Sequence, residues 1–229
     1  MKKSHIATLL VFFVLIPATL FLGTKLPGRS FYITGTLMIL ELMLPFFMAF
    51  EGRRPQAREL VIIAVMCALA IAGRAAIPIP NIKAIFAVII LTGIAFGPEA
   101  GFMVGAISAF ASNFLYGQGA HTPWQMFAYG AGGMLAGFCF AKGRLAAKPD
   151  TMAVFGFATV LLWVGPLLDC STVFLGLATI NLQSVITILA SGFPMNITQA
   201  VCTAMVLLFL GRPLLDKLDR IKTKYGILA

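Results

Sequence analysis

Residues 97–141 read GPEAGFMVGAISAFASNFLYGQGAHTPWQMFAYGAGGMLAGFCFA. Two apolar segments, each near the length that crosses a bilayer, flank a short polar segment at 116–123. Polar side chains at membrane depth are costly and normally face a cavity or another helix, while glycine and alanine let helices approach closely. The stretch therefore predicts an all-α integral membrane protein that receives a polar ligand at one face of the bilayer.

The composition of the chain agrees with a membrane protein. Of its 229 residues, 60% are hydrophobic and 11% are charged, more apolar surface than a water-soluble domain of this size can bury. The sequence has no GxxxxGK[ST] phosphate loop, so an ATP-driven role requires a partner chain. It also has no HExxH motif, nucleophile elbow or CxxC pair, and its only histidines are His5 and His121. These absences give an intramembrane enzyme little support and exclude a His-rich metal site.

Membrane-spanning segments are predicted at 5–22, 30–50, 59–77, 83–97, 98–116, 123–141, 152–170 and 187–210. Short breaks at 77–81 and at Gly97-Pro98 separate the third, fourth and fifth. The apolar run of the first is longer than that of a usual signal peptide and no convincing cleavage site follows it, so we expect it to be retained. The region 169–193 is apolar but contains polar side chains, and the sequence leaves open whether it spans the membrane, re-enters it or lies at its surface.

The basic residues set the predicted orientation. With eight spans and an inside N-terminus, all 17 Lys and Arg residues except Lys25, Arg29, Arg74 and Lys83 lie inside. This positive-inside asymmetry places both termini in the cytoplasm and explains the net charge of +9 without nucleic acid. The tail after residue 211 is predicted to be an amphipathic basic helix, with Leu214, Leu215, Leu218 and Ile221 on one face. It is either an interfacial helix or a surface for a cytoplasmic partner.

Small residues recur at four-residue spacing on two predicted helices. Ala64, Ala68 and Ala72 share one face of the third span, and Gly130, Met134 and Ala136 or Gly137 share a face of the sixth. Such a face either packs inside the bundle or docks a separate membrane subunit, and spacing alone does not separate the two.

Polar and aromatic residues cluster at the predicted outer ends of the spans. Arg74, Asn81 and Lys83 flank the first outer break, where they either snorkel or take an anionic or amide-bearing ligand. Trp and Tyr are common at membrane interfaces, but amides inside spans are not, so the group around the second outer loop is a candidate ligand site or gate. This group comprises Asn113, Tyr116, Gln118, His121, Trp124, Gln125 and Tyr129.

Two acids in apolar stretches are further candidates. Asp169, together with Asn196 and Gln199 on the last span, places polar groups in the outer half of the membrane. An intramembrane acid is a functional candidate, but Asp169 also fits a structural pair with Arg74 or a protonated, hydrogen-bonding acid. Glu41 in the second span has the same alternatives.

Several motifs in order carry a resemblance to a known family. They are RELVIIAVMCALAIAGR at 58–74, IPNIK at 79–83, GIAFGP at 93–98, GF at 101–102, SNF at 112–114, GQG at 117–119, TPWQMF at 122–127 and GRPLLDKLDRIK at 211–222. Over about 58–225 the chain resembles the substrate-binding S components of energy-coupling factor (ECF) vitamin transporters. The nearest branch is the cobalamin-type S component.

The resemblance implies a six-helix core in the bacterial cell membrane that captures a vitamin outside and releases it inside. It implies docking on a transmembrane coupling subunit driven by two ATPase subunits, which use the ATP, with no cofactor bound by this chain. Ala64 and Ala68 match the family's small-xxx-small docking motif, and the family's ligand-carrying outer loops correspond here to 74–83 and 116–124. We therefore expect two N-terminal helices at 1–57, the core at 58–211 and a basic cytoplasmic tail at 212–229.

The chain departs from the family in two places: the N-terminal spans within about 1–50 lie outside the usual core, and His121 stands where this branch often has an aromatic residue. Two other functions stay open. One is an S component for another vitamin, and the other is a self-sufficient secondary transporter for a small polar metabolite, with Asp169 or Glu41 carrying protons. The latter favours paired broken helices in two matching halves, and the break at 77–81 has no clear counterpart.

Overall fold

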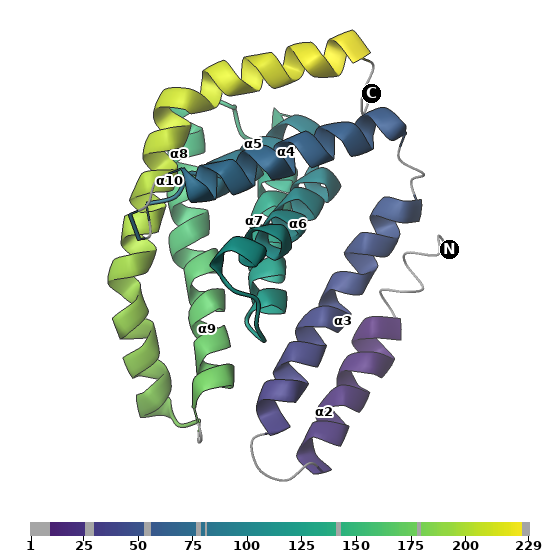
Figure 1. The fold of residues 1–229 in the computed structure, drawn as a ribbon, viewed down its shortest axis with the longest axis vertical. Helices are drawn as coiled ribbons and strands as arrows, with labels where there is room; N and C mark the ends of the chain where they lie inside the picture. The colour runs from purple at the N-terminus through teal and green to yellow at the C-terminus, as the bar shows by residue number, and fades with distance from the viewer. Residues whose placement is uncertain are drawn as a thin grey trace.

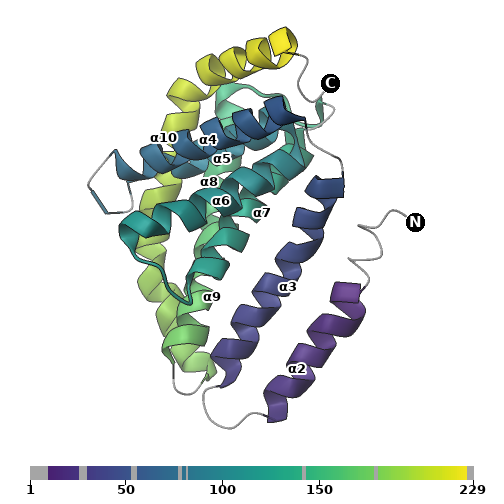
Figure 2. The ribbon, with the colours of Figure 1, turned by 45° about the vertical axis from the view of Figure 1, so that its right-hand side comes forward.

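The computed structural model describes residues 10–25, 30–52, 56–76, 79–80, 82–140, 143–177 and 180–225, and all regular structure in these ranges is helical. A helical hairpin comes first. The π-helical turn η1 (Val11–Leu15) leads into α2 (Ile16–Lys25), and α3 (Ser30–Gly52) returns. Figures 1 and 2 show α2 and α3 side by side on one flank, where α3 contacts α6, α7 and α9.

The remaining elements are α4 (Ala57–Ala75), α5 (Ile85–Phe96), α6 (Pro98–Tyr116), α7 (Thr122–Phe140), α8 (Pro149–Thr159), η3 (Val160–Val164), α9 (Gly165–Gly176) and α10 (Leu182–Tyr225). The predicted break at Gly97-Pro98 is confirmed. Gly97 has a φ of 92°, a left-handed conformation that favours glycine, and Pro98 opens α6. The region 169–193 is divided between the end of α9 and the start of α10, which are neighbours.

Helices that can cross a membrane by length and composition lie at Ile33–Gly52, Pro149–Gly176 and Leu182–Lys224 in the described part of the chain. The helix at Pro149–Gly176 consists of α8, η3 and α9, which follow one another without a break (Figure 1). The helix at Leu182–Lys224 belongs to α10. The helix at the expected span 83–97 is α5, which has only 12 residues. At about 1.5 Å per residue it is shorter than the roughly 30 Å hydrocarbon layer, so it does not cross by itself.

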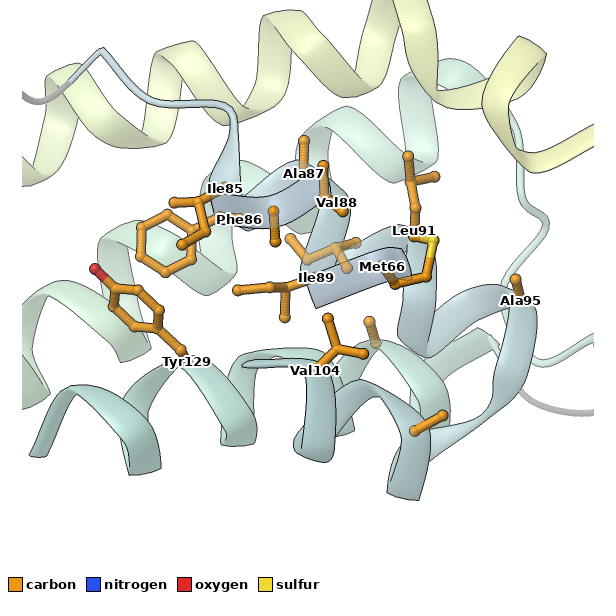
Figure 3. Packing of buried hydrophobic residues seen from close by; sticks show 14 of the residues in the cluster. Met66, Ile85, Phe86, Ala87, Val88, Ile89, Leu91, Ala95, Val104 and Tyr129 are labelled. Carbon is orange, nitrogen blue, oxygen red and sulfur yellow. The ribbon is translucent and has the colours of Figure 1, made fainter. Parts of the chain in front are cut away.

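The short helix α5 forms the centre of the core. All of its residues except Ile94 are buried, and it contacts α4, α6, α7 and α10. Figure 3 shows its side chains in one apolar cluster with Met66 of α4 and Val104 of α6. Because protein surrounds α5, its length need not match the bilayer.

Glycine holds α6 and α7 in direct backbone contact. A Cβ added to Gly133 would lie 2.3 Å from the carbonyl oxygen of Gly101, and one added to Gly101 would lie 2.4 Å from that of Gly133. No real Cβ contact is that short, so only glycine fits at either position. This contact sets the separation of the two helices that the polar segment at 116–123 connects.

The basic tail continues the last spanning helix, because α10 runs unbroken from Leu182 to Tyr225. Leu215 is buried and Leu214 and Leu218 pack against the core, whereas Ile221 is 38% exposed; the apolar face expected for a membrane interface or a partner thus covers the protein's own core. Nζ of Lys222 donates to the carbonyl oxygen of Ala95 at 3.1 Å. That oxygen lies in the last turn of α5, where helix carbonyls lack partners and a cation is favourable.

Candidate functional site

The side chain of Asn113, in the last turn of α6, joins three helix ends. Its Nδ2 donates to Oγ1 of Thr122 at 3.1 Å and to Oε1 of Gln125 at 2.7 Å, both in the first turn of α7. Its Oδ1 accepts from Nη1 of Arg74 at 2.9 Å, in the last turn of α4. Asn113 is 1% exposed, and both amide hydrogens and the carbonyl oxygen have partners. It therefore fixes these three helix ends relative to one another.

The guanidinium of Arg74 lies between this network and an exposed ring. Nη1 also donates to Oγ of Ser112, and the guanidinium carbon lies 4.6 Å from the centroid of the Tyr116 ring. The Tyr116 hydroxyl in turn donates to the carbonyl oxygen of Arg74 at 3.0 Å. These partners of Arg74 are neutral, so none of them cancels its positive charge.

Tyr116 is 47% exposed, and a second cation besides Arg74 lies over its ring. Nζ of Lys83 lies 5.8 Å from the centroid of its ring. Gln118 is exposed; its Nε2 donates to the carbonyl oxygen of Phe110 at 2.9 Å and its Oε1 accepts from Thr122 at 2.9 Å. His121 is half-buried at the start of α7. The exposed side of the network thus offers an aromatic ring, two cations and amides.

The indole of Trp124 points toward the N-terminal hairpin and away from this exposed side. It is 6% exposed and stacks on Phe174 of α9 with the ring centroids 5.4 Å apart. Gly35 of α3 lies beside it, where a Cβ would come within 3.2 Å of Cζ2 of the indole. Nε1 of Trp124 has no hydrogen-bond partner among the described residues. Trp124 therefore packs the start of α7 against α3 and α9 and does not line the exposed side of the network.

Tyr129 is also buried, one turn farther along α7. Its ring packs edge-on against Phe86 of α5 with centroids 4.6 Å apart, inside the apolar cluster of Figure 3. In its own helix it lies one turn beyond Gln125, as the spacing predicted, but it faces α5 and not the loop between α6 and α7.

The pair Asp169 and Asn196 lies elsewhere, between α9 and α10. Nδ2 of Asn196 donates to Oδ2 of Asp169 at 2.8 Å, so Asp169 pairs with an amide and the alternative of a pair with Arg74 is wrong. The helices approach closely here, since a Cβ on Gly192 would lie 2.4 Å from Oδ1 of Asp169. Across the described ranges no three His, Cys, Asp or Glu side chains are grouped to hold a metal ion.

The sequence did not single out Ser112 and Thr122 as site residues, although both hold the network together. The available signal was weak: Thr122 directly precedes Pro123, a pattern typical of a helix start, and Ser112 lies next to the intramembrane amide Asn113. Asn81, predicted as a ligand contact, lies outside the described residues.

The two faces of small residues differ in the structure. Ala64, Ala68 and Ala72 of α4 are all exposed, whereas Gly130 and Gly137 of α7 are buried against α6 and its N-terminal turn. The face of α7 is thus internal packing, and the face of α4 is available to lipid or to another subunit.

Comparison with known proteins identifies the family. No curated protein and no solved structure matches the chain. Residues 55–216 match the model of the family described as ECF-type riboflavin transporter, S component. The match supports the transport-subunit interpretation over an enzyme and supports the alternative of another vitamin better than the cobalamin-type branch. It covers every described element from α4 to α9 and most of α10. The chain therefore belongs to the family of riboflavin-type S components of ECF transporters.

Proposed function

We propose that this chain captures a flavin, riboflavin in the first instance, at the outer face of a bacterial membrane and delivers it inward after docking on a coupling subunit. The observation that carries the proposal is the match of 55–216 to the riboflavin-type S components. Two partner ATPase subunits use the ATP, and this chain binds no cofactor of its own.

The exposed side of the Asn113 network suits this ligand chemically. The isoalloxazine ring of riboflavin is flat, carries carbonyl and N–H groups at one edge, and bears a chain of hydroxyls. The exposed ring of Tyr116 offers a stacking surface. Arg74 and Lys83, which flank that ring, offer donors to carbonyl oxygens, and the amides of Gln118 and Gln125 match hydroxyls.

The other residues at and around the site take supporting roles in the proposal. Asn113 and Thr122 position the helix ends, while Trp124 and Tyr129 support α7 from its buried sides. In the sequence, His121 lies three residues after Gln118 and Asn81 lies two residues before Lys83. Asp169 and Asn196 fasten α9 to α10 on the outer side of the core.

Docking is assigned to α4. Its exposed face carries Ala64, Ala68 and Ala72 beside larger apolar side chains such as Val65, and the alanines admit close approach of a partner helix. Ile63, Met66, Cys67 and Ala70 bury the opposite face in the core. The same helix carries Arg74 in its last turn. A single rigid element thus connects the ligand network with the docking face.

The ligand is tested by titrating the purified full chain with riboflavin, and separately with cobalamin, in detergent. Binding next to Tyr116 should quench flavin fluorescence, and cobalamin should bind at least roughly tenfold more weakly, a difference of about 1.4 kcal/mol. Tight binding of cobalamin without binding of riboflavin would return the assignment to the cobalamin branch.

Dependence on partners is tested by uptake. Cells that express the chain with an ECF coupling subunit and its ATPases should accumulate riboflavin, and an ATPase-inactive module should abolish that accumulation. Sustained accumulation by the chain alone in proton-loaded vesicles would instead support a secondary transporter.

A further inference from the structure

The segment between α4 and α5 brings Lys83 to the proposed site, and its last residues are held from two sides. On one side, the backbone N–H of Ala84 donates to the carbonyl oxygen of Gly73 in α4 at 3.0 Å. On the other, α10 supplies two donors to the carbonyl oxygen of Lys83: Nε2 of Gln199 at 2.7 Å and Sγ of Cys202 at 3.5 Å.

The Lys83 carbonyl needs such donors because of its place in the chain. It precedes Ala84, the N-cap of α5, and the first helical N–H groups bond to Ala84 and the residues after it. The shorter and stronger of its two bonds comes from the amide of Gln199, since a thiol is a weak donor. The orientation of this peptide group, and hence the direction in which the Lys83 side chain leaves the backbone, depends on α10.

The amide of Gln199 is itself positioned on α10. Its Nε2 lies 3.4 Å from Oγ1 of Thr203, and that hydroxyl donates to the backbone oxygen of Gln199 at 2.8 Å. Thr203 is fully buried and Gln199 is half-buried, so water competes little for these bonds.

We propose that Gln199 is a positioning residue for ligand binding: it holds the backbone of Lys83 so that the Lys83 ammonium stays over the Tyr116 ring at the rim of the site. The assignment of Lys83 to the ligand rests on the proposed function. The link also makes the position of α10 a determinant of affinity, although no residue of α10 lies in the network around Asn113.

The test uses Gln199→Met, which keeps the length of the side chain and removes its N–H donors. The matched control is Gln183→Met, the same substitution at an exposed position of the same helix. Without ligand, hydrogen exchange at the amides of residues 82–88 should be faster in Gln199→Met and unchanged in the control. Unchanged exchange at 82–88 in Gln199→Met would overturn the positioning role, whatever the chain binds.

Ligand affinity is then measured in a double-mutant cycle with Lys83→Met. Gln199→Met and Lys83→Met should each raise the Kd for riboflavin about two- to tenfold, as expected for one lost hydrogen bond. The double variant should be no weaker than the weaker single variant, because both changes act through the same ammonium. Multiplicative effects would show that Gln199 does not act through Lys83 and would overturn the proposal.

Two controls keep the outcomes separate. Gln199→Asn retracts the amide by one methylene and should change exchange and affinity in the same direction, which serves as the readout if Gln199→Met does not fold. If the unaltered chain fails to bind riboflavin, the proposed function fails, while the exchange experiment still decides whether Gln199 fixes the segment.

Discussion

Asn113 is engaged through all of its side-chain hydrogen-bonding groups, and this decides what its replacement does. Arg74, Thr122 and Gln125 each make one hydrogen bond to it. Asn113 is only 1% exposed, so water cannot replace these bonds. Tyr116 differs, because its ring is 47% exposed and its removal leaves no buried group unpaired. The two residues should therefore respond differently to mutation.

We expect Asn113→Leu to lower both the stability of the protein and its affinity for ligand. A buried group left without its partner costs about 1–3 kcal/mol, and three partners lose a bond here. Tyr116→Leu should lower affinity with little change in stability. Thermal unfolding in detergent and riboflavin titration measure the two quantities. If Asn113→Leu lost affinity without losing stability, Asn113 would not be the residue that fixes the three helix ends.

Local sequence patterns predicted some of these residues and not others. Asn113 and Gln125 could be predicted because an amide inside an apolar helix is unusual, and that can be recognised from the local sequence alone. The position of Trp124 could not, since its partners Gly35 and Phe174 lie in distant parts of the chain. The sequence grouped Asp169 with Asn196 but did not predict their hydrogen bond, because the two residues lie on different helices.

Among the elements, α6 and α7 depend on glycine for their contact. The breaks that bound α6 were predictable because Gly97, Pro98 and Gly117 impose local backbone geometry, with Gly117 at a φ of 102°. The four-residue spacing of small residues on α4 and α7 was equally visible. Which of those two faces is buried was not, because spacing repeats identically on an internal and an external face.

We expect Gly133→Ala to destabilise the protein by about 1–3 kcal/mol or more, because the added methyl would overlap the Gly101 carbonyl and force α6 and α7 apart. Gly52→Ala is the matched control, since a Cβ there meets nothing within 4 Å. Thermal unfolding compares the two variants. Equal stability of both would mean that the helices are not in backbone contact.

The exposed face of α4 predicts a separable assembly defect. Ala68→Leu places a branched side chain where a partner helix must approach closely, and Ala190→Leu makes the same change at an exposed position of α10. Co-purification with the coupling subunit and uptake should fall for Ala68→Leu alone, while both variants keep the riboflavin affinity of the unaltered chain. If Ala68→Leu loses ligand binding and keeps assembly, the face belongs to internal packing.

At the scale of the whole molecule, the N-terminal hairpin lies outside the family match, which begins at residue 55. It covers parts of α6, α7 and α9 through α3 and leaves Ala64, Ala68 and Ala72 exposed. The division at 57 and 211 stays a prediction. The second boundary falls inside α10, whose charged end packs on the core through Leu215 and Lys222.

The orientation of the whole chain gives the last prediction. The 17 Lys and Arg residues include five on the end of α10 (Arg212, Lys217, Arg220, Lys222 and Lys224), and a cluster of this kind is retained on the cytoplasmic side. The exposed loop at Gln118 precedes α7 and lies well away from that end in Figure 1. The loop should therefore face the outside of the cell.

Cysteine labelling in intact cells tests this orientation, in a background where Cys67, Cys139, Cys170 and Cys202 are replaced by alanine. A membrane-impermeant maleimide should label Gln118→Cys directly, because that position is exposed and outside. Lys217→Cys, equally exposed on the tail, should react only after the membrane is permeabilised. The reverse pattern would invert the topology, and with it would move the Tyr116 and Arg74 site to the cytoplasmic face, where it could not capture a vitamin from outside.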